Sequence, residues 1–369
     1  MKNASIPAIA FCMAAGSVSA GGIDRSGQSI APLFQDGNYA EISVGTAIPS
    51  VSGSVGGIQS GDVASSYWQF GAAMKQQIND NLSYSIIFDQ PFGADLKYLG
   101  TTAYPLRSTF AELDSSALTG VLRYRMDNGI GLHGGLRVQR VEATAGVPVV
   151  SGYSVTGEAG YGTGYLAGFS YERPDIALRI SLTYNSKIAT DHRTSERLAV
   201  GGLALTTTTE IETPQSVNLE FQTGIAQDTL LFGGVRWVDW SDFTIDPFVY
   251  RTATGVPFLS YDDDTYTYTL GVGRRITDTW SGSVSLTYED GDSNKPVSNL
   301  GPTSGKIGVT VGARYKTDNF SVSTGVNYTW IGDATTNVPI AAGPPRVFAR
   351  SFFSDNSAIG FGVKVGWHY

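Results

Sequence analysis

The sequence has almost no cysteine, little charge and no long apolar run. Cys12 is the only cysteine in 369 residues, so a disulfide framework and cysteine-based metal sites are excluded from the rest of the chain. No stretch of about 18 apolar residues occurs, which excludes a membrane-spanning helix. Charged residues make up only 16%, and the net charge of −8 with a pI near 4.9 argues against nucleic acid as a partner.

The N-terminus has the order of a secretory signal peptide. Lys2 supplies a positive charge, residues 6–15 form a short apolar run, and Val18-Ser19-Ala20 offers small residues for cleavage. We therefore predict a signal peptide over residues 1–20. Because Cys12 lies within it, the mature chain would carry no cysteine.

The abundant residues suit a membrane-spanning β-barrel. The chain has 45 Gly, 19 Tyr and 17 Phe, and its last segment, residues 358–369, alternates strictly. Odd positions there are Ile, Phe, Val, Val, Trp and Tyr, whereas the even positions are Ala, Gly, Gly, Lys, Gly and His. Such a dyad repeat ending on an aromatic residue is typical of a transmembrane strand. A half-buried strand of a soluble protein shows the same alternation, so the decision depends on repetition along the chain.

This pattern recurs in fourteen segments from Tyr39 onward. We expect strands over residues 39–50, 65–77, 82–92, 112–126, 130–142, 161–172, 176–188, 212–225, 229–240, 264–276, 279–290, 304–316, 319–332 and 356–369. Tight polar turns follow the even segments, as at Asp127-Asn128-Gly129, and longer connections follow the odd ones. That asymmetry is typical of outer-membrane barrels, which close because lipid leaves no backbone group unpaired. The sequence predicts an all-β fold, a 14-stranded antiparallel transmembrane β-barrel.

The side of these strands opposite the apolar face would line the lumen and is rich in cations. The candidate ligand-binding residues are Arg123, Arg137, Arg179, Arg236, Arg275, Arg314 and Lys364. Arginine binds carboxylates well through its bidentate geometry, so these residues favour an anionic head group. Pairing across neighbouring strands is an equally open interpretation for each arginine.

Three motifs are similar to the FadL family of outer-membrane transporters, the FadL/TodX-like carriers of hydrophobic compounds and long-chain fatty acids. They are Pro91-Phe92-Gly93, Tyr184-Asn185-Ser186-Lys187-Ile188 and Trp237-Val238-Asp239-Trp240. The resemblance covers the mature chain and implies a barrel over residues 39–369 with a short N-terminal plug over residues 21–38. The family's usual Asn-Pro-Ala segment is replaced here by residues 31–38, which shortens the plug.

The resemblance also implies a route in which a ligand enters between extracellular loops, binds in the lumen and leaves sideways through a gap in the wall. The predicted outer loops 143–160 and 189–211 carry apolar residues, which indicate either a capture site or loops packed on each other. The candidate capture residues are Val149, Val150, Leu203 and Leu205, with Leu33 and Phe34 in the plug and Phe243 and Phe248 in the fifth outer loop. Pro91 and Gly93 are candidates for the lateral gap, because proline removes a ladder donor.

Together these features predict passive uptake of hydrophobic compounds, most of all long-chain fatty acids, by a monomer in the outer membrane of a Gram-negative cell. The alternatives are uptake of aromatic hydrocarbons by the same route, a general porin, and a structural surface barrel. Its partners would be the hydrophobic ligand, outer-membrane lipid and lipopolysaccharide. We expect no enzyme activity, cofactor or metal, because His133, His192 and His368 are isolated in the sequence.

Overall fold

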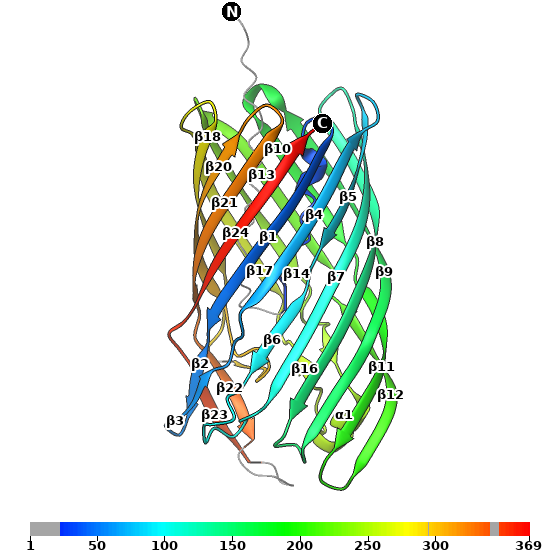
Figure 1. The fold of residues 1–369 in the computed structure, drawn as a ribbon, viewed down its shortest axis with the longest axis vertical. Helices are drawn as coiled ribbons and strands as arrows, with labels where there is room; N and C mark the ends of the chain where they lie inside the picture. The colour runs from blue at the N-terminus through cyan, green and yellow to red at the C-terminus, as the bar shows by residue number, and fades with distance from the viewer. Residues whose placement is uncertain (1–22, 294, 340–346) are drawn as a thin grey trace, which may run out of the picture.

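The computed structural model describes residues 23–293, 295–339 and 347–369, which are mainly β-structure (Figure 1). The expected signal peptide, residues 1–20, lies outside the described residues, as do the first two residues of the expected plug. None of the helices in the described part of the chain has the length and hydropathy of a membrane span.

The described strands form a closed antiparallel barrel of 14 strands, as the sequence predicted. Three of these strands are interrupted and carry two labels each. The wall consists of β1 (Tyr39–Ser50), β4 (Tyr67–Gln77), β5 (Leu82–Asp89) with β6 (Gly93–Lys97), β7 (Phe110–Arg125), β8 (Ile130–Val147), β9 (Tyr153–Arg173), β10 (Leu178–Asn185) with β11 (Ile188–Leu198), β12 (Leu203–Thr213) with β13 (Ser216–Ala226), β14 (Thr229–Val238), β17 (Thr265–Arg275), β18 (Trp280–Glu289), β20 (Lys306–Lys316), β21 (Phe320–Ile331) and β24 (Asn356–His368). β1 closes the barrel by pairing with both β4 and β24.

Shorter elements lie mainly at the end of the barrel opposite the C-terminus (Figure 1). A small sheet contains β19 (Pro296–Val297), β22 (Ala334–Pro339), β23 (Phe348–Phe353), β2 (Ser52–Val55) and β3 (Ile58–Asp62), and β15 (Thr244–Ile245) pairs with β16 (Leu259–Ser260). The helix α1 (Phe248–Thr254) also lies there, whereas the 3-10 helix η2 (Pro174–Ile176) forms a short turn between β9 and β10. We call this end, which carries the long connections, the outer end.

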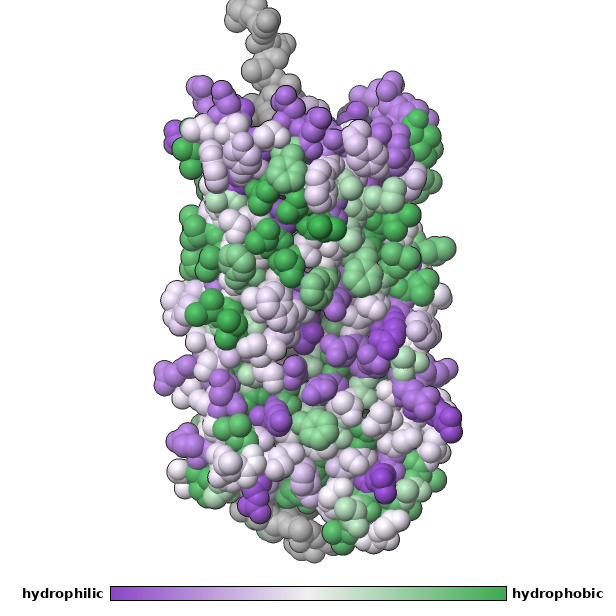
Figure 2. Space-filling view, in the orientation of Figure 1, coloured by the Kyte–Doolittle hydropathy of each residue, from purple (hydrophilic) through white to green (hydrophobic). Residues whose placement is uncertain are grey.

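The two faces of the wall differ as the alternation predicts. Leu270 of β17 and Leu286 of β18 are paired in the ladder, and both large apolar side chains are more than half exposed on the outside of the barrel. Figure 2 shows such hydrophobic residues gathered over the half of the barrel nearer the C-terminus, with hydrophilic residues at both ends. Closure leaves no unpaired strand edge in this apolar band, which a lipid environment requires.

The outer part of the wall has more strand than the sequence predicted. The expected loops 143–160 and 189–211 are largely hairpins, because β8 continues to Val147, β9 begins at Tyr153, and β11 and β12 pair along their full length. Threonines 206–209 extend β12 because β-branched residues suit a pleated strand. The candidate residues of these expected loops therefore lie on or beside hairpins.

The strand expected over residues 176–188 is interrupted between β10 and β11. The strand expected over residues 212–225 is interrupted between β12 and β13, because Pro214 supplies no backbone donor there. The first interruption reverses which side chains face inward. Lys187, expected inside, is therefore exposed and pairs with Glu212 at 2.8 Å.

Residues 23–38 lie inside the barrel and include the 3-10 helix η1 (Ala31–Phe34). Ile30, Leu33 and Phe34 are buried in a cluster with inner-wall residues that include Ile87 and Leu166. We refer to residues 23–38 as the inner segment.

Candidate functional site

The ladder between the second and third strands of the barrel is interrupted. β4 pairs with β5 as far as Ala72 and Phe88, and the next pair toward the outer end is the single bridge between Ala64 and Leu96. Residues 65–71 and 89–95 lie between these pairs, and we call this interruption the first wall gap. Pro91 and Gly93, the predicted lateral-gap residues, lie within it.

A one-residue offset explains this gap. β5 pairs Asp89 with Ala117 of β7, whereas β6 pairs Gly93 with Asp114, so the third strand contains one extra residue between these pairs. A bulge of this kind turns later side chains to the opposite face. Because proline supplies no donor, Pro91 suits a position where pairing ends.

The inner segment pairs with the bulged strand from inside the barrel. The Arg25 N–H donates to the Pro91 carbonyl, and the Gly93 N–H donates to the Ile23 carbonyl, both at 2.8 Å. Ser115 accepts from the Phe92 N–H at 2.8 Å and donates to the Phe92 carbonyl at 2.6 Å. These bonds satisfy polar backbone groups that the interrupted ladder leaves unpaired.

Arg25 fills the space beside the gap. Its guanidinium lies 4.0 Å from the centre of the Tyr67 ring and 3.7 Å from Asp114. A Cβ at position 93 would collide with this guanidinium, so Gly93 provides the room for it. Burial lowers the pKa of Arg25, while Tyr67, Asp114 and Asp95 act to raise it.

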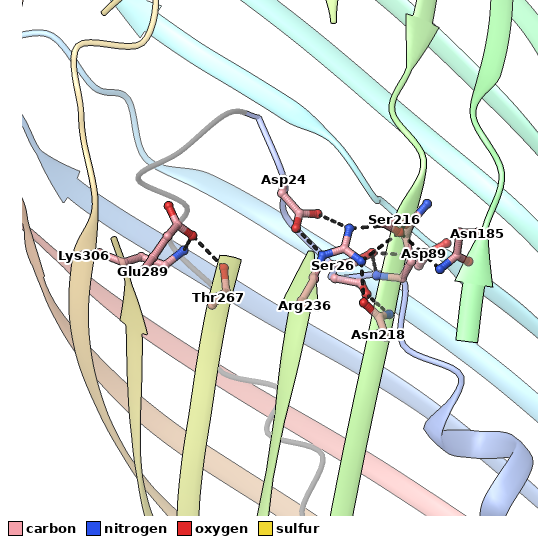
Figure 3. Close-up of polar contacts among 12 residues, drawn as sticks. Asp24, Ser26, Asp89, Asn185, Ser216, Asn218, Arg236, Thr267, Glu289 and Lys306 are labelled. Carbon is pink, nitrogen blue, oxygen red and sulfur yellow. Dashed lines mark hydrogen bonds and ion pairs between the residues drawn. The ribbon is translucent and has the colours of Figure 1, made fainter. Parts of the chain in front are cut away.

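Arg236 of β14 binds the start of the inner segment (Figure 3). It forms a bidentate pair with Asp24, with N···O distances of 2.6 and 3.1 Å, and both side chains are mostly buried. The same guanidinium donates to Asn218 at 2.8 Å, and Asn218 donates to the Gly27 carbonyl at 2.9 Å. Ser26 donates to Asp89 at 2.6 Å, which ties the segment to the third strand as well.

The end of the inner segment is bound by residues of β4, β7 and β10. Lys75 donates to the carbonyls of Gln35 and Gly37 at 2.7 and 2.9 Å. The ring of Phe34 contacts two guanidinium groups, those of Arg123 and Arg179, which lie 4.9 and 4.7 Å from its centre.

The seven cations predicted to bind ligand do not form one site. Three of them contact the inner segment: Arg123 and Arg179 contact Phe34, and Arg236 binds Asp24. The others contact the wall: Arg137 donates to Thr119 at 2.8 Å, Arg275 donates through Nε to Asp228 at 2.8 Å, and Lys364 lies 3.6 Å from Glu41. Arg123 also pairs with Glu172 at 2.8 Å, and Arg314 is buried on β20. A further buried pair, Lys306 and Glu289, lies apart from the Asp24 cluster in Figure 3.

Two cavities extend inward from the outer end. An outer groove of about 1080 Å³ is lined by Val149, Val150, Tyr250, Phe258 and Leu300 among others. An apolar cavity of about 60 Å³ shares Phe258 and Leu300 with the groove and reaches Ile23 of the inner segment.

Two further cavities lie at the first wall gap. A cavity of about 110 Å³ shares Ile23, Ala94 and Leu300 with the apolar cavity and is also lined by Arg25 and Tyr67. A wall cavity of about 160 Å³ shares Arg25 with it and is lined by Phe70, Phe88 and Lys364. Phe70 and Phe88 belong to the outward-facing apolar set, so this cavity reaches the lipid-facing surface.

The predicted capture residues are distributed unequally over these cavities. Val149 and Val150 line the outer groove. The others do not line any of these four cavities. Leu203 and Leu205 on β12 and Phe248 at the start of α1 are exposed. Phe243 is buried against Trp240 and Tyr261, and Leu33 and Phe34 are buried in the inner segment.

Several residues at these sites had no signal in the sequence. Asp24, Ser26 and Ser115 are unremarkable polar residues until the fold brings them beside the gap. Glu196 is fully buried on β11 and accepts from the Val249 and Tyr250 N–H groups at 3.0 Å, so it anchors α1 above the outer groove. Isolated glutamates on strands give no indication of such a role.

The described residues contain no group of three or more His, Cys, Asp or Glu side chains arranged to hold a metal ion. The three histidines have separate partners: His133 lies 3.0 Å from Thr183, His192 contacts Thr190 and the Glu158 carbonyl, and His368 contacts the Asp36 carbonyl.

A barrel of 14 strands with an inner segment and a wall gap can be compared with known proteins. The family model described as outer membrane protein transport protein (OMPP1/FadL/TodX) matches residues 34–369. The chain belongs to this family. It is therefore an outer-membrane β-barrel of a family of transporters for hydrophobic compounds, not of an enzyme family.

Solved structures share the fold of this FadL/TodX-family protein at low sequence identity. A Pseudomonas aeruginosa FadL homologue matches with a TM-score of 0.74 and 14% identity over 92% of each chain. The Pseudomonas putida toluene transporter TodX matches with 0.64 and 11% over 96% of each chain. The Ralstonia pickettii toluene transporter TbuX matches with 0.65 and 12% over 96% of this chain and 97% of its own. No curated protein sequence matches the chain.

Proposed function

We propose that this barrel captures a hydrophobic small molecule in the outer groove, passes it beside the inner segment and releases it sideways through the first wall gap. The observation that carries this proposal is the order of the cavities. Phe258 joins the outer groove to the apolar cavity, Ile23 joins that cavity to the gap, and Arg25 lines both cavities at the gap. Movement along this route is diffusion and needs no energy source.

Long-chain fatty acids are our first candidate ligand. The outer groove is large and its lining is mainly apolar, which suits a long alkyl chain. The wall cavity is lined by Arg25 and Lys364 together with Glu41 and Asp89, and a ligand carboxylate that follows its chain through the gap would exchange with Glu41 as the partner of Lys364. The fixed cations deeper in the wall hold the inner segment instead, so we propose that segment as the plug.

Aromatic hydrocarbons are a second candidate, for a specific reason. Among the described residues, the outer groove and the apolar cavity are lined by no lysine or arginine but by Asp262 and Glu112, so a neutral ligand avoids the repulsion that these acids exert on a carboxylate. At about 60 Å³ the apolar cavity is smaller than the roughly 150 Å³ of a cavity known to hold benzene. A compact ligand therefore needs the smallest rearrangement, and two structurally similar proteins are described as toluene transporters.

The proposal includes no catalytic step and no cofactor. We further propose that the barrel acts as a monomer surrounded by outer-membrane lipid and lipopolysaccharide, because its closed wall needs no partner strand. A general porin would instead give a steady large conductance in planar bilayers, and a structural surface barrel would give no ligand uptake.

The test is uptake of labelled palmitate and labelled toluene by cells that lack their own transporter, with and without this protein. We expect the protein to raise uptake of at least one compound. Equal uptake of both compounds with and without a correctly inserted barrel would contradict the proposal.

Lys364→Gln separates the two ligands. If a carboxylate passes the wall cavity, this change lowers palmitate uptake several-fold and leaves toluene uptake unchanged. Lys187→Gln is the matched control, because Lys187 is exposed on the outer face and lines none of the four cavities.

A further inference from the structure

The ladder of the wall is interrupted a second time, between β9 and the divided strand β10–β11. β10 pairs with β9 as far as Asn185 and Leu166, and β11 pairs with β9 again from Thr194 and Gly157. No ladder pair is formed between residues 158–165 and residues 186–193, all of which are described. We call this interruption the second wall gap.

Two staggered bulges produce this gap. On β9, Glu158 and Ala159 together face the single residue Glu142 of β8. On the neighbouring strand, the inward set changes from Asn185 to Ile188 across the break between β10 and β11. Between the bulges the two strands are one residue out of phase, so their donors and acceptors do not face each other. The first wall gap also contains a bulge, at residues 90–92.

Side chains satisfy the polar groups that this ladder leaves unpaired. Ser186 accepts from the Tyr165 N–H at 2.9 Å, and the Ser186 N–H donates to the Tyr165 carbonyl at 2.9 Å. His192 Nδ1 donates to the Glu158 carbonyl at 2.8 Å, at the bulge itself. These bonds keep the interruption stable in the folded barrel, because a buried backbone N–H or carbonyl without a hydrogen bond would destabilise it.

The inner face of β9 is bare along the gap. Gly160, Gly162 and Gly164 occupy its successive inward positions, and β11 lies against them. A Cβ at position 162 would collide with the Ala189 carbonyl oxygen and lie 3.0 Å from Thr190 Cγ2, and one at position 164 would lie 2.6 Å from Ile188 Cγ1. Ile188, Thr190 and His192 therefore cover the gap from inside, where no β9 side chain opposes them.

The gap adjoins the apolar cavity on the inside and the edge of the apolar band on the outside. Gly157, His192 and Thr194, at its outer end, all line the apolar cavity. At its other end Tyr165 and Tyr184 lie on the outer surface with ring centres 6.0 Å apart, as in an aromatic girdle. The exposed pair Lys187 and Glu212 lies beyond that girdle.

We infer that the second wall gap is a second lateral opening, through which an apolar molecule already dissolved in the outer leaflet reaches the apolar cavity. This opening is an entrance and the first wall gap is the exit, so such a molecule need not pass the outer groove. The inference rests on the proposed function for its direction of transport, but the opening itself can be tested without transport.

The first test measures access from lipid. Thr190→Cys and Thr119→Cys place a thiol at equally buried inward positions, one in the gap and one in the intact ladder of β7 and β8. Each purified variant in phosphatidylcholine vesicles is treated with a long-chain alkyl maleimide dissolved in the lipid. We expect at least tenfold faster labelling of Thr190→Cys. Equal rates would overturn the inference, whether or not the protein transports a ligand.

The second test closes the gap with a disulfide. In Gly164→Cys/Ile188→Cys the Cβ at 164 would lie 2.6 Å from the position of Ile188 Cγ1, and its nearest neighbours are side-chain atoms rather than backbone, so a disulfide fits with small shifts. Gly131→Cys/Ser170→Cys is the control, because these residues are paired in the intact ladder of β8 and β9 and the corresponding distance is 2.6 Å. Cys12 is the only natural cysteine and lies in the predicted signal peptide, so no other thiol of the predicted mature chain would compete.

With the disulfide formed in both variants, we expect uptake of the transported compound to fall at least fivefold in the first variant only and to recover with reductant. Equal uptake by the two oxidised variants would overturn the inference. Absence of uptake by the unmodified protein would contradict the proposed function instead, and the labelling rates would then decide whether the opening exists.

Discussion

At the scale of single residues, cations of the inner wall bind groups of the chain itself. Arg236 pairs with Asp24, Arg123 with Glu172, and Lys364 lies near Glu41. Breaking a buried pair by removing one partner costs far more than the pair contributes, because the remaining charge stays buried. These residues therefore hold the inner segment and the wall in one arrangement.

The bidentate pair of Arg236 and Asp24 gives the first prediction at this scale. Asp24→Asn removes a charge-assisted bond worth about 2 kcal/mol, or roughly thirtyfold in an opening equilibrium. We expect the inner segment to leave its site more often, which single-channel recording in planar bilayers would detect as a roughly thirtyfold rise in the fraction of time spent conducting.

Arg275→Gln is the control for this experiment. Arg275 binds Asp228 in the turn between β13 and β14 and has no contact with residues 23–38 among the described bonds. Its conductance should equal that of the unmodified protein, and an equal rise in both variants would show that Asp24 does not act through the inner segment.

At the scale of elements, the wall consists of regular strands with interruptions, and at each interruption side chains bond the backbone groups that the ladder leaves unpaired. Ser115 bonds the backbone of the bulged third strand, and Ser186 and His192 bond the backbone of β9 at the second wall gap. Glu196 attaches α1 to β11. In each case a polar side chain substitutes for ladder or helix-end bonds that the local geometry removes.

Glu196 gives the prediction at this scale. Glu196→Gln replaces one carboxylate oxygen with a donor, so the Val249 and Tyr250 N–H groups lose an acceptor, at a cost of about 2 kcal/mol for α1. Arg251 lies within α1 and its side chain is half exposed. We expect roughly thirtyfold faster trypsin cleavage after Arg251 when opening is fast relative to cleavage.

Glu210→Gln serves as the matched control, because Glu210 is exposed on the same hairpin. It should leave the cleavage rate unchanged. If Glu196→Gln also leaves the rate unchanged, Glu196 is not the residue that holds α1.

At the scale of the whole molecule, the barrel is longer than its apolar band. The hydrophobic surface covers the half near the C-terminus, while the hairpins and the small sheet extend beyond it at the outer end (Figures 1 and 2). The proposed ligand capture therefore belongs to the outer half, the two wall gaps lie where the apolar band ends, and the short turns belong to the other end.

A pair of arginine substitutions tests this placement. Leu270→Arg puts a charge on the lipid face of β17, which costs about 2–4 kcal/mol at the bilayer midplane. Leu203→Arg puts the same charge at an exposed position of the β11–β12 hairpin, where about 0–1 kcal/mol is expected. Equilibrium unfolding by urea in phosphatidylcholine vesicles would measure both, and equal losses would contradict the placement of the band.

Alternation and turns allowed the barrel to be predicted from the sequence. Each strand carries its own period-two pattern, and lipid requires every backbone group to pair, so strand number and closure follow from local information. Pro91 also marked the position of the first interruption, because a missing donor is visible in the sequence.

Only the tertiary structure decided what the polar residues do. The break between β10 and β11 reversed the side of Lys187, since a one-residue bulge changes every later side chain and leaves little mark in composition. Arg236 binds Asp24 across 212 positions of sequence, and the second wall gap depends on two bulges on different strands being out of step. These contacts join distant positions, so periodicity, which reports only on neighbours along the chain, could not reveal them.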